Sequence, residues 1–144
     1  MGDGRLVMTR LNRTMVATLE GSIDTAALGA LIDSLSESQA WHIADSVVLE
    51  VSACEVMDRE EFVQLQKAVR TVELLGFRCV VAGLKPGIVA YIVSSGVELG
   101  ALRTALDLEL ALEELSADDD GQEQESELGG DVETERESDS FGPV

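Results

Sequence analysis

The residues best placed to do chemistry are four charged residues at the start of an expected helix. Asp58, Arg59, Glu60 and Glu61 precede a segment in which apolar residues recur every three or four positions. Asp58 can accept a hydrogen bond from the backbone of that helix, and Glu61 can reach back to the backbone of Asp58, so the spacing predicts a capping box. A helix N-terminus carries unpaired N–H donors and partial positive charge, which favour negative groups. The four residues therefore predict a charged surface at a helix start.

A strand–helix–strand unit must position this surface. Residues 47–51 form an apolar run that is typical of a buried strand, and residues 79–83 form a second one. Between them, a helix with one apolar side is expected to end at Gly76. Its apolar positions are Phe62, Leu65, Val69 and Val72. Residues 46–84 therefore predict one parallel crossover in which the helix lies on a sheet.

The segments on either side complete an α/β pattern. Residues 5–10 and 14–19 are short β-prone runs that predict an opening hairpin, with Asn12 in its turn. A first helix is expected from about Ala27 to Ala40, and after the crossover Pro86 suits the first position of a third helix that Gly96 ends. The buried side of the third helix is expected to hold Ile88, Val89, Ile92 and Val93.

The last part of the chain divides into a helix and an acidic tail. Residues 104–107, Thr-Ala-Leu-Asp, predict a second capping box that opens a final helix. Residues 1–115 hold 17 acidic and 9 basic side chains (−8), and residues 116–144 hold 11 acidic and 1 basic (−10). Residues 116–144 are so polar that they cannot bury enough apolar surface to offset the conformational entropy lost on ordering. We expect one domain over residues 1–115 and a disordered acidic tail over residues 116–144. The tail either solubilises the protein or acts as an electrostatic shield that competes with acidic partners for a basic patch.

Composition argues against several functional classes. The net charge of −18 and the lack of a basic patch argue against nucleic acid as a partner. The single histidine, His42, leaves no catalytic triad or histidine metal cluster, and Cys54 and Cys79 suit apolar strand ends better than a metal site. Residues 83–87 are rich in glycine but lack the phosphate-loop pattern. We therefore expect no enzyme, no metal and no cofactor. With no signal peptide or membrane-length apolar stretch, we expect a cytoplasmic protein with no membrane partner.

Three motifs resemble the STAS domain family of anti-sigma-factor antagonists, and most of all the small stand-alone STAS proteins of bacterial stressosomes. They are the strand-to-helix turn at residues 56–58, the segment 74–86 and the ending at residues 104–109. The resemblance covers residues 47–115. It implies an α/β fold in which a mixed β-sheet is flanked by helices.

The resemblance also implies a function in protein–protein regulation. Members of the STAS domain family bind a serine/threonine switch kinase or an anti-sigma factor. They also assemble with other STAS-domain proteins into a stressosome-like complex, so we expect a homo- or hetero-oligomer. The implied partner-binding surface consists of Asp58, Arg59, Glu60, Lys85, Pro86, Gly87 and Tyr91.

One departure from the family pattern bears directly on regulation. The residue after the turn aspartate is usually a serine or threonine that the kinase phosphorylates, and here it is Arg59. A phosphate at a helix start would add about −1.5 to −2 charges, whereas Arg59 places a permanent cation there. Either control has moved to another residue, or the chain is a structural scaffold subunit without a kinase partner. An ordinary solvated Arg59 fits the second reading.

A second modification position in related stressosome proteins lies on the helix after Pro86. Tyr91 is closest to that position, and it fits equally a packing residue whose hydroxyl lies at the surface. Ser52, Ser94 and Ser95 are further candidates for phosphorylation. The sequence leaves the choice between them open.

Overall fold

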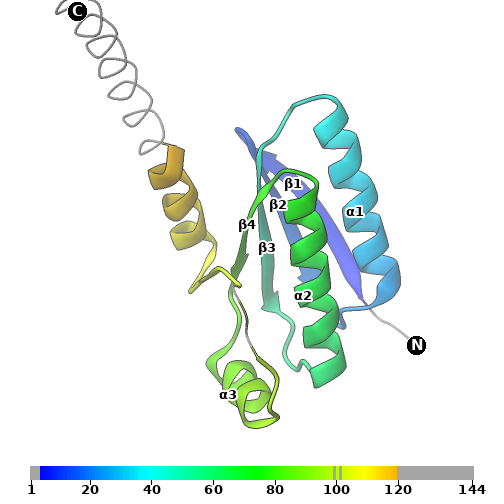
Figure 1. The fold of residues 1–144 in the computed structure, drawn as a ribbon, viewed down its shortest axis with the longest axis vertical. Coiled ribbons are helices and arrows are strands. Elements are labelled where there is room, and N and C mark those ends of the chain that lie inside the picture. The colour runs from blue at the N-terminus through cyan, green and yellow to red at the C-terminus, as the bar shows by residue number, and fades with distance from the viewer. Residues whose placement is uncertain (1–3, 99, 101, 120–144) are drawn as a thin grey trace, which may run out of the picture. The chain divides into compact units, whose positions relative to one another are not determined.

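The fold is built on one five-stranded mixed sheet (Figure 1). The computed structural model describes residues 4–98, 100 and 102–119. The strands are β1 (Arg5–Leu11), β2 (Thr14–Glu20), β3 (Ser46–Ala53), β4 (Arg78–Ala82) and β5 (Thr104–Ala105), and they lie side by side in that order. β1 and β2 are antiparallel, and the other neighbours are parallel. The predicted opening hairpin is confirmed, with Asn12 in its turn at a φ of 56°.

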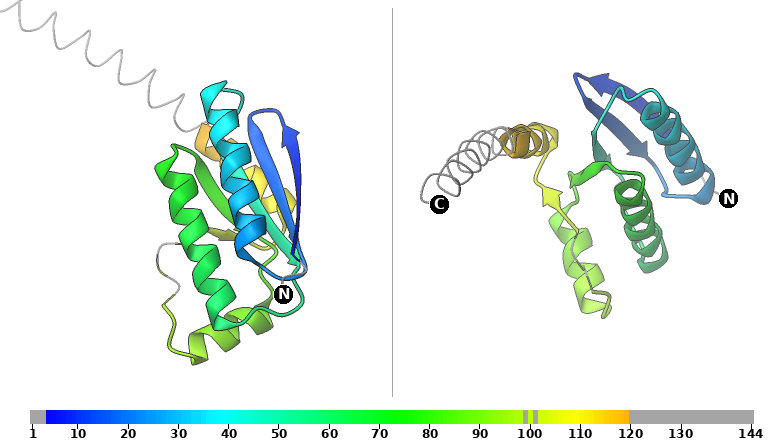
Figure 2. Two further views of the ribbon diagram at one scale, coloured as in Figure 1. Left: turned by 90° about the vertical axis from the view of Figure 1, so that its right-hand side faces the viewer. Right: turned by 45° about the horizontal axis from the view of Figure 1, so that its top comes forward.

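Two helices cover one face of this sheet. α1 (Thr25–Ala40) and α2 (Arg59–Leu74) lie side by side on that face (Figures 1 and 2). α3 (Pro86–Ser94) lies at the end of the sheet where β3 and β4 finish. The predicted α/β fold, in which helices flank a mixed sheet, is confirmed.

The chain divides into two compact units, Met1–Leu112 and Glu113–Val144. Residues 108–119 are helical, so the final helix runs past the predicted domain boundary at residue 115. That boundary remains a prediction. Residues 120–144 of the predicted tail lie outside the described residues.

Strand alternation and helix periodicity together create an aliphatic core. Every second residue of β2 and β3 points to the face beneath the helices, because successive side chains in a strand alternate between the two faces. α2 adds its apolar stripe, which includes the fully buried Phe62. The core residues of β2, β3, α1 and α2 are Met15, Ala17, Leu19, Ala27, Leu28, Leu31, Leu35, Val47, Leu49, Val51, Phe62, Leu65, Ala68, Val69 and Val72. The predicted amphipathic character of α2 is therefore confirmed.

Two local expectations were wrong. Val93 is 54% exposed and Val89 is half-buried, so α3 buries only Ile88 and Ile92. This helix of nine residues contacts the core through a narrow stripe because it lies at the end of the sheet rather than on its face. Two buried positions four residues apart form that stripe.

The predicted capping box at residues 104–107 was also wrong. Thr104 belongs to β5 and pairs with Val81 of β4, so it is not the cap of the final helix. Asp107 takes that role, since its Oδ1 accepts a hydrogen bond of 2.9 Å from the backbone N–H of Leu110. Pairing with a distant strand decided this region, and a local motif contains no information about such pairing.

Both cysteines are buried, as the sequence predicts. Cys54 is fully buried at the end of β3, and Cys79 in β4 is 3% exposed. Burial, together with the negative charge of Glu61, raises the pKa of the Cys54 thiol to about 11. Burial and the charge of Glu73 raise the pKa of the Cys79 thiol to about 12.

We therefore expect both thiols of the native protein to be almost unreactive toward a disulfide reagent such as DTNB at pH 8. The thiolate is the nucleophile, and a raised pKa leaves very little thiolate at that pH. Absorbance at 412 nm would measure the thionitrobenzoate released from the reagent. The same protein in guanidinium chloride should release two equivalents of it rapidly, one for each cysteine. Rapid release from the native protein would show that this strand region opens.

Candidate functional site

Two helix starts lie together at one edge of the sheet. β3 and β4 are parallel neighbours, so both strands end at the same edge. The chain leaves β3 to begin α2 and leaves β4 to begin α3, and both helices start at this edge (Figures 1 and 2). In open α/β sheets, the carboxyl ends of the strands are where ligands and partners most often bind. The topology therefore places Asp58 and Lys85 in the same region although they are far apart in sequence.

The start of α2 is fixed by the predicted capping box, which the structure confirms. Asp58 Oδ1 accepts a hydrogen bond of 2.8 Å from the backbone N–H of Glu61. In return, Glu61 Oε1 accepts one of 3.3 Å from the backbone N–H of Asp58. The second carboxylate oxygen of Glu61 accepts a further bond of 2.9 Å from the backbone N–H of Ile23, in the loop between β2 and α1. Sequence reasoning missed this third bond, which ties the helix start to a distant loop.

Arg59, the first residue of α2, presents its guanidinium to solvent. The residue is exposed, and it forms no ion pair with any other described residue. Glu61 cannot neutralise it without losing its bonds to the backbone of Asp58 and Ile23. A cation therefore stands at the positive end of a helix dipole, an arrangement that costs about 0.3–1 kcal/mol until a negative group approaches.

The start of α3 depends on a tight turn after β4. Gly83 has a φ of +82°, and a Cβ on this residue would lie 2.8 Å from Cβ of Ser52 and 3.0 Å from its backbone nitrogen. Lys85 is the residue before the helix and makes no side-chain capping bond, and Pro86 occupies the first turn as predicted. The Nζ atom of Lys85 instead forms an ion pair of 2.9 Å with Oε2 of Glu55. This pair joins the two helix starts.

A pocket of about 450 Å³ lies between these helix starts. It is lined by Glu55, Val56, Met57, Asp58, Lys85, Gly87, Ile88 and Tyr91. The structure thus brings together four of the seven predicted partner-binding residues. The other three, Arg59, Glu60 and Pro86, adjoin the lining along the chain and are exposed.

Sequence reasoning missed the apolar half of this lining. Val56 is 76% exposed and Met57 is buried, and together with Ile88 they make the pocket largely apolar. The one available signal was an apolar pair, Val56 and Met57, in a short connection where polar turn residues are usual.

The hydroxyl groups that are candidates for phosphorylation have different surroundings. The Tyr91 side chain lines the pocket and is 52% exposed, so the residue both packs and remains accessible. The hydroxyls of Ser94 and Ser95 each donate a hydrogen bond of 2.9 Å to the backbone oxygen of Tyr91. Ser52 is exposed in β3, and its backbone N–H donates to Glu50 Oε1 at 2.7 Å. Phosphorylation at any of these positions remains a prediction.

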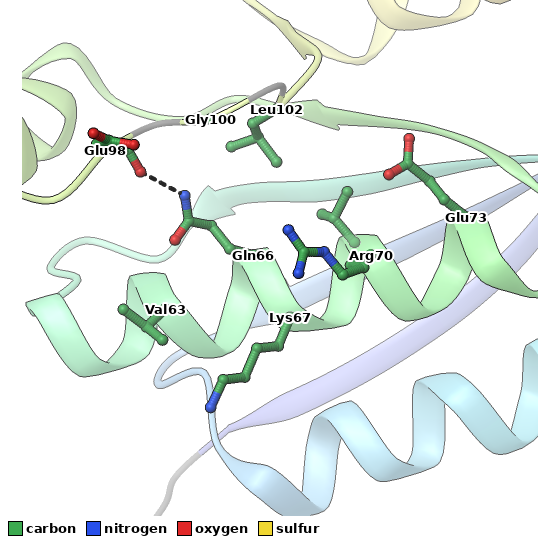
Figure 3. Close-up of a pocket in the computed structure, with 9 residues that line it drawn as sticks. Val63, Gln66, Lys67, Arg70, Glu73, Glu98, Gly100 and Leu102 are labelled. Carbon is green, nitrogen blue, oxygen red and sulfur yellow. Dashed lines mark hydrogen bonds between the residues drawn. The ribbon is translucent and has the colours of Figure 1, made fainter.

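A second pocket, of about 360 Å³, lies between α2 and the segment before β5 (Figure 3). α2 supplies Lys67 and Arg70 to it, and the segment before β5 supplies Glu98 and Leu102. Gln66 bridges the two, since its Nε2 donates a hydrogen bond of 2.8 Å to the backbone oxygen of Glu98. This pocket has mixed charge and contains none of the predicted site residues.

The described part of the chain has neither a metal-binding cluster nor a membrane-spanning helix. In residues 4–98, 100 and 102–119, no group of three or more His, Cys, Asp or Glu side chains could hold a metal ion. None of the helices described there is long and apolar enough to span a membrane.

Comparison with known proteins gives one relative and two solved structures of particular interest. The chain is 28% identical over 89 residues to RsbRA of Bacillus subtilis, an RsbT co-antagonist protein, and this match covers 62% of the chain but only 32% of RsbRA. A serine-to-glutamate variant of Moorella thermoacetica RsbS is 26% identical, with a TM-score of 0.63 over 78% of this chain and 96% of that one. A chain in a structure of the stressosome is 24% identical, with a TM-score of 0.56 over 77% of this chain and 96% of that one.

The family follows from a match along most of the described fold. The model of the STAS domain matches residues 5–111, which run from the first residue of β1 into the final helix. This range includes both helix starts and the pocket between them. The chain therefore belongs to the STAS domain family.

Proposed function

We propose that this chain is a non-enzymatic regulator that binds a serine/threonine switch kinase or an anti-sigma factor through the edge that holds the 450 Å³ pocket. Other STAS-domain proteins would join it in a stressosome-like assembly. The observation that carries this proposal is the meeting of two helix starts around an accessible, largely apolar pocket. Apolar groups, aromatic ones above all, at the centre and polar or charged residues at the rim are typical of a protein–protein interface.

The similar proteins support the same class of partner. RsbRA is an RsbT co-antagonist, and the RsbS and stressosome structures share the fold of this chain. The chain spans about a third of RsbRA, so the activity of the whole relative does not transfer to it directly. We therefore propose an RsbT-like kinase as the partner class and RsbR-like proteins as the STAS neighbours.

Arg59 determines how such a partner would regulate the chain. A kinase that binds this edge meets a guanidinium where a phosphorylatable STAS protein presents a hydroxyl. Phosphorylation of residue 59 could then not switch this binding on or off, because a serine kinase cannot transfer phosphate to an arginine side chain. The exposed position of Arg59 at the first turn of α2 leaves room for a serine there.

We expect Arg59→Ser to become a substrate of the kinase that copurifies with the protein from its own cells, whereas residue 59 of the unchanged protein stays unmodified. The new phosphate would sit at a helix N-terminus, where N–H donors and the helix dipole stabilise it. Incubation with the kinase and ATP, followed by mass spectrometry of the peptide that contains residue 59, measures the outcome.

Glu60→Ser is the matched control, because it places the same hydroxyl one residue further along α2. The kinase should leave it unmodified, since one residue of helix rotates the side chain by about 100°. If Arg59→Ser binds the kinase and still stays unmodified, residue 59 does not occupy the acceptor position.

A scaffold role is the second candidate, and the arginine at position 59, which offers no hydroxyl for phosphorylation, favours it. A chain that cannot be modified at residue 59 could also act by packing against other STAS proteins alone, without binding a kinase. Affinity purification at moderate salt separates the two functions. Recovery of STAS-domain proteins without a kinase would support the scaffold.

A further inference from the structure

The pocket between the two helix starts has the properties of a socket for one large apolar side chain. Two of its lining residues are exposed, Val56 to 76% and Tyr91 to 52%. Two more, Met57 and Ile88, are buried. Its volume of about 450 Å³ lies within the range of about 300–1,000 Å³ of small-molecule pockets, so it has room for a large apolar side chain. Exposed apolar side chains gathered around one hollow usually mark a binding surface.

The charges around this socket select the rest of the ligand. Carboxylates outnumber cations at this edge by three to two: Glu55 and Asp58 line the pocket and Glu60 adjoins it, against Lys85, which pairs with Glu55 at 2.9 Å, and Arg59. Residues 1–115 as a whole carry 17 acidic and 9 basic side chains. A basic segment is therefore attracted to this edge, and an acidic one is repelled.

We propose that the pocket binds a partner segment that inserts one large apolar side chain and flanks it with basic residues. This inference rests on the proposed function, in which this edge binds a protein partner, and it specifies what that partner must present. Burial of the inserted side chain supplies most of the affinity. The flanking cations steer the encounter and exclude acidic competitors.

Three short peptides test the proposal without requiring an identified partner. The probe is acetyl-Lys-Arg-Leu-Phe-Arg-Lys-amide. The second peptide replaces Leu-Phe by Gly-Ser and keeps the charge, and the third, acetyl-Glu-Asp-Leu-Phe-Asp-Glu-amide, keeps Leu-Phe and reverses the charge. Titration of the full chain, labelled with ¹⁵N, should shift the amide signals of residues 55–58 and 87–91 with the probe. The Gly-Ser peptide should bind about tenfold more weakly, because removal of a partly buried apolar side chain costs about that much affinity.

Two exposed residues of similar character give a matched pair of variants. Val56→Ser removes an apolar wall of the pocket, and Leu74→Ser removes an 81% exposed apolar side chain from the last residue of α2. Because both side chains are largely exposed, both variants should fold. We expect Val56→Ser to weaken binding of the probe about fivefold or more and Leu74→Ser to leave it unchanged.

Several outcomes would overturn the proposal. They are equal binding of the probe and the Gly-Ser peptide, tighter binding of the acidic peptide, shifts confined to other residues, and no shifts at millimolar probe. Sedimentation that shows a dimer lost in Val56→Ser would assign the pocket to a second copy instead. These outcomes are read separately from the kinase assay on Arg59→Ser, so a failure of this proposal can be told apart from a failure of the proposed function.

Discussion

Replacement of Gly83 by alanine is expected to lower the free energy of unfolding by about 2–4 kcal/mol. The φ of +82° at this residue costs a residue with a side chain about 1–2 kcal/mol. In addition, the new Cβ would lie 2.9 Å from Glu50 Oε1 and 3.0 Å from the backbone nitrogen of Ser52, and that backbone belongs to the central strand β3 and cannot move cheaply. Thermal unfolding followed by circular dichroism should show a Tm lower by roughly 10 °C or more.

Gly29→Ala is the matched control for this prediction. Gly29 lies inside α1, and a Cβ there would meet no atom within 4 Å. Because alanine is the better helix former, this variant should gain about 0.5–1 kcal/mol. A Gly83→Ala variant as stable as the unchanged protein would mean that the turn between β4 and α3 can relax. That turn could then not hold Lys85 and Gly87 in fixed positions beside the pocket.

The helix starts illustrate which parts of the site can be predicted from sequence. The capping box at the start of α2 was predictable because Asp58 and Glu61 are three residues apart and their bonds are local. The start of α3 was predictable for a similar reason, since proline favours the first helical turn. The parallel order of β3 and β4 then followed from a single strand–helix–strand pattern.

Contacts between segments distant in sequence could not be predicted in this way. The ion pair of Lys85 with Glu55 and the bond of Glu61 to Ile23 join residues 30 or more positions apart. The pocket likewise depends on how closely α3 approaches residues 55–58, which no periodicity specifies. At Thr104 the sequence predicted a feature that is absent: a local motif indicated a helix cap, but pairing with β4 makes this residue part of a strand. In each case the deciding interaction was tertiary.

We expect Glu61→Ala to destabilise the fold by about 2–3 kcal/mol, far more than the loss of an exposed charge. Its carboxylate accepts hydrogen bonds from the backbone N–H groups of Asp58 and Ile23, and Ile23 is 4% exposed. A buried donor without an acceptor costs about 1–3 kcal/mol, and loss of half of the capping box adds to this. Urea unfolding would measure the change, and hydrogen exchange at the Ile23 amide should become faster than in the unchanged protein.

The neighbouring glutamate provides the control, because Glu60 has the same side chain on the same helical turn and is exposed. Glu60→Ala should change stability by no more than about 0.5 kcal/mol. Glu61→Gln should fall between the two, since its amide keeps one carbonyl oxygen for two donors. If Glu61→Ala and Glu60→Ala were equally mild, the loop before α1 would be held by other contacts. The ordered series would instead show that Glu61 locks the first turn of α2 to that loop, and with it the position of Arg59 at the partner-binding edge.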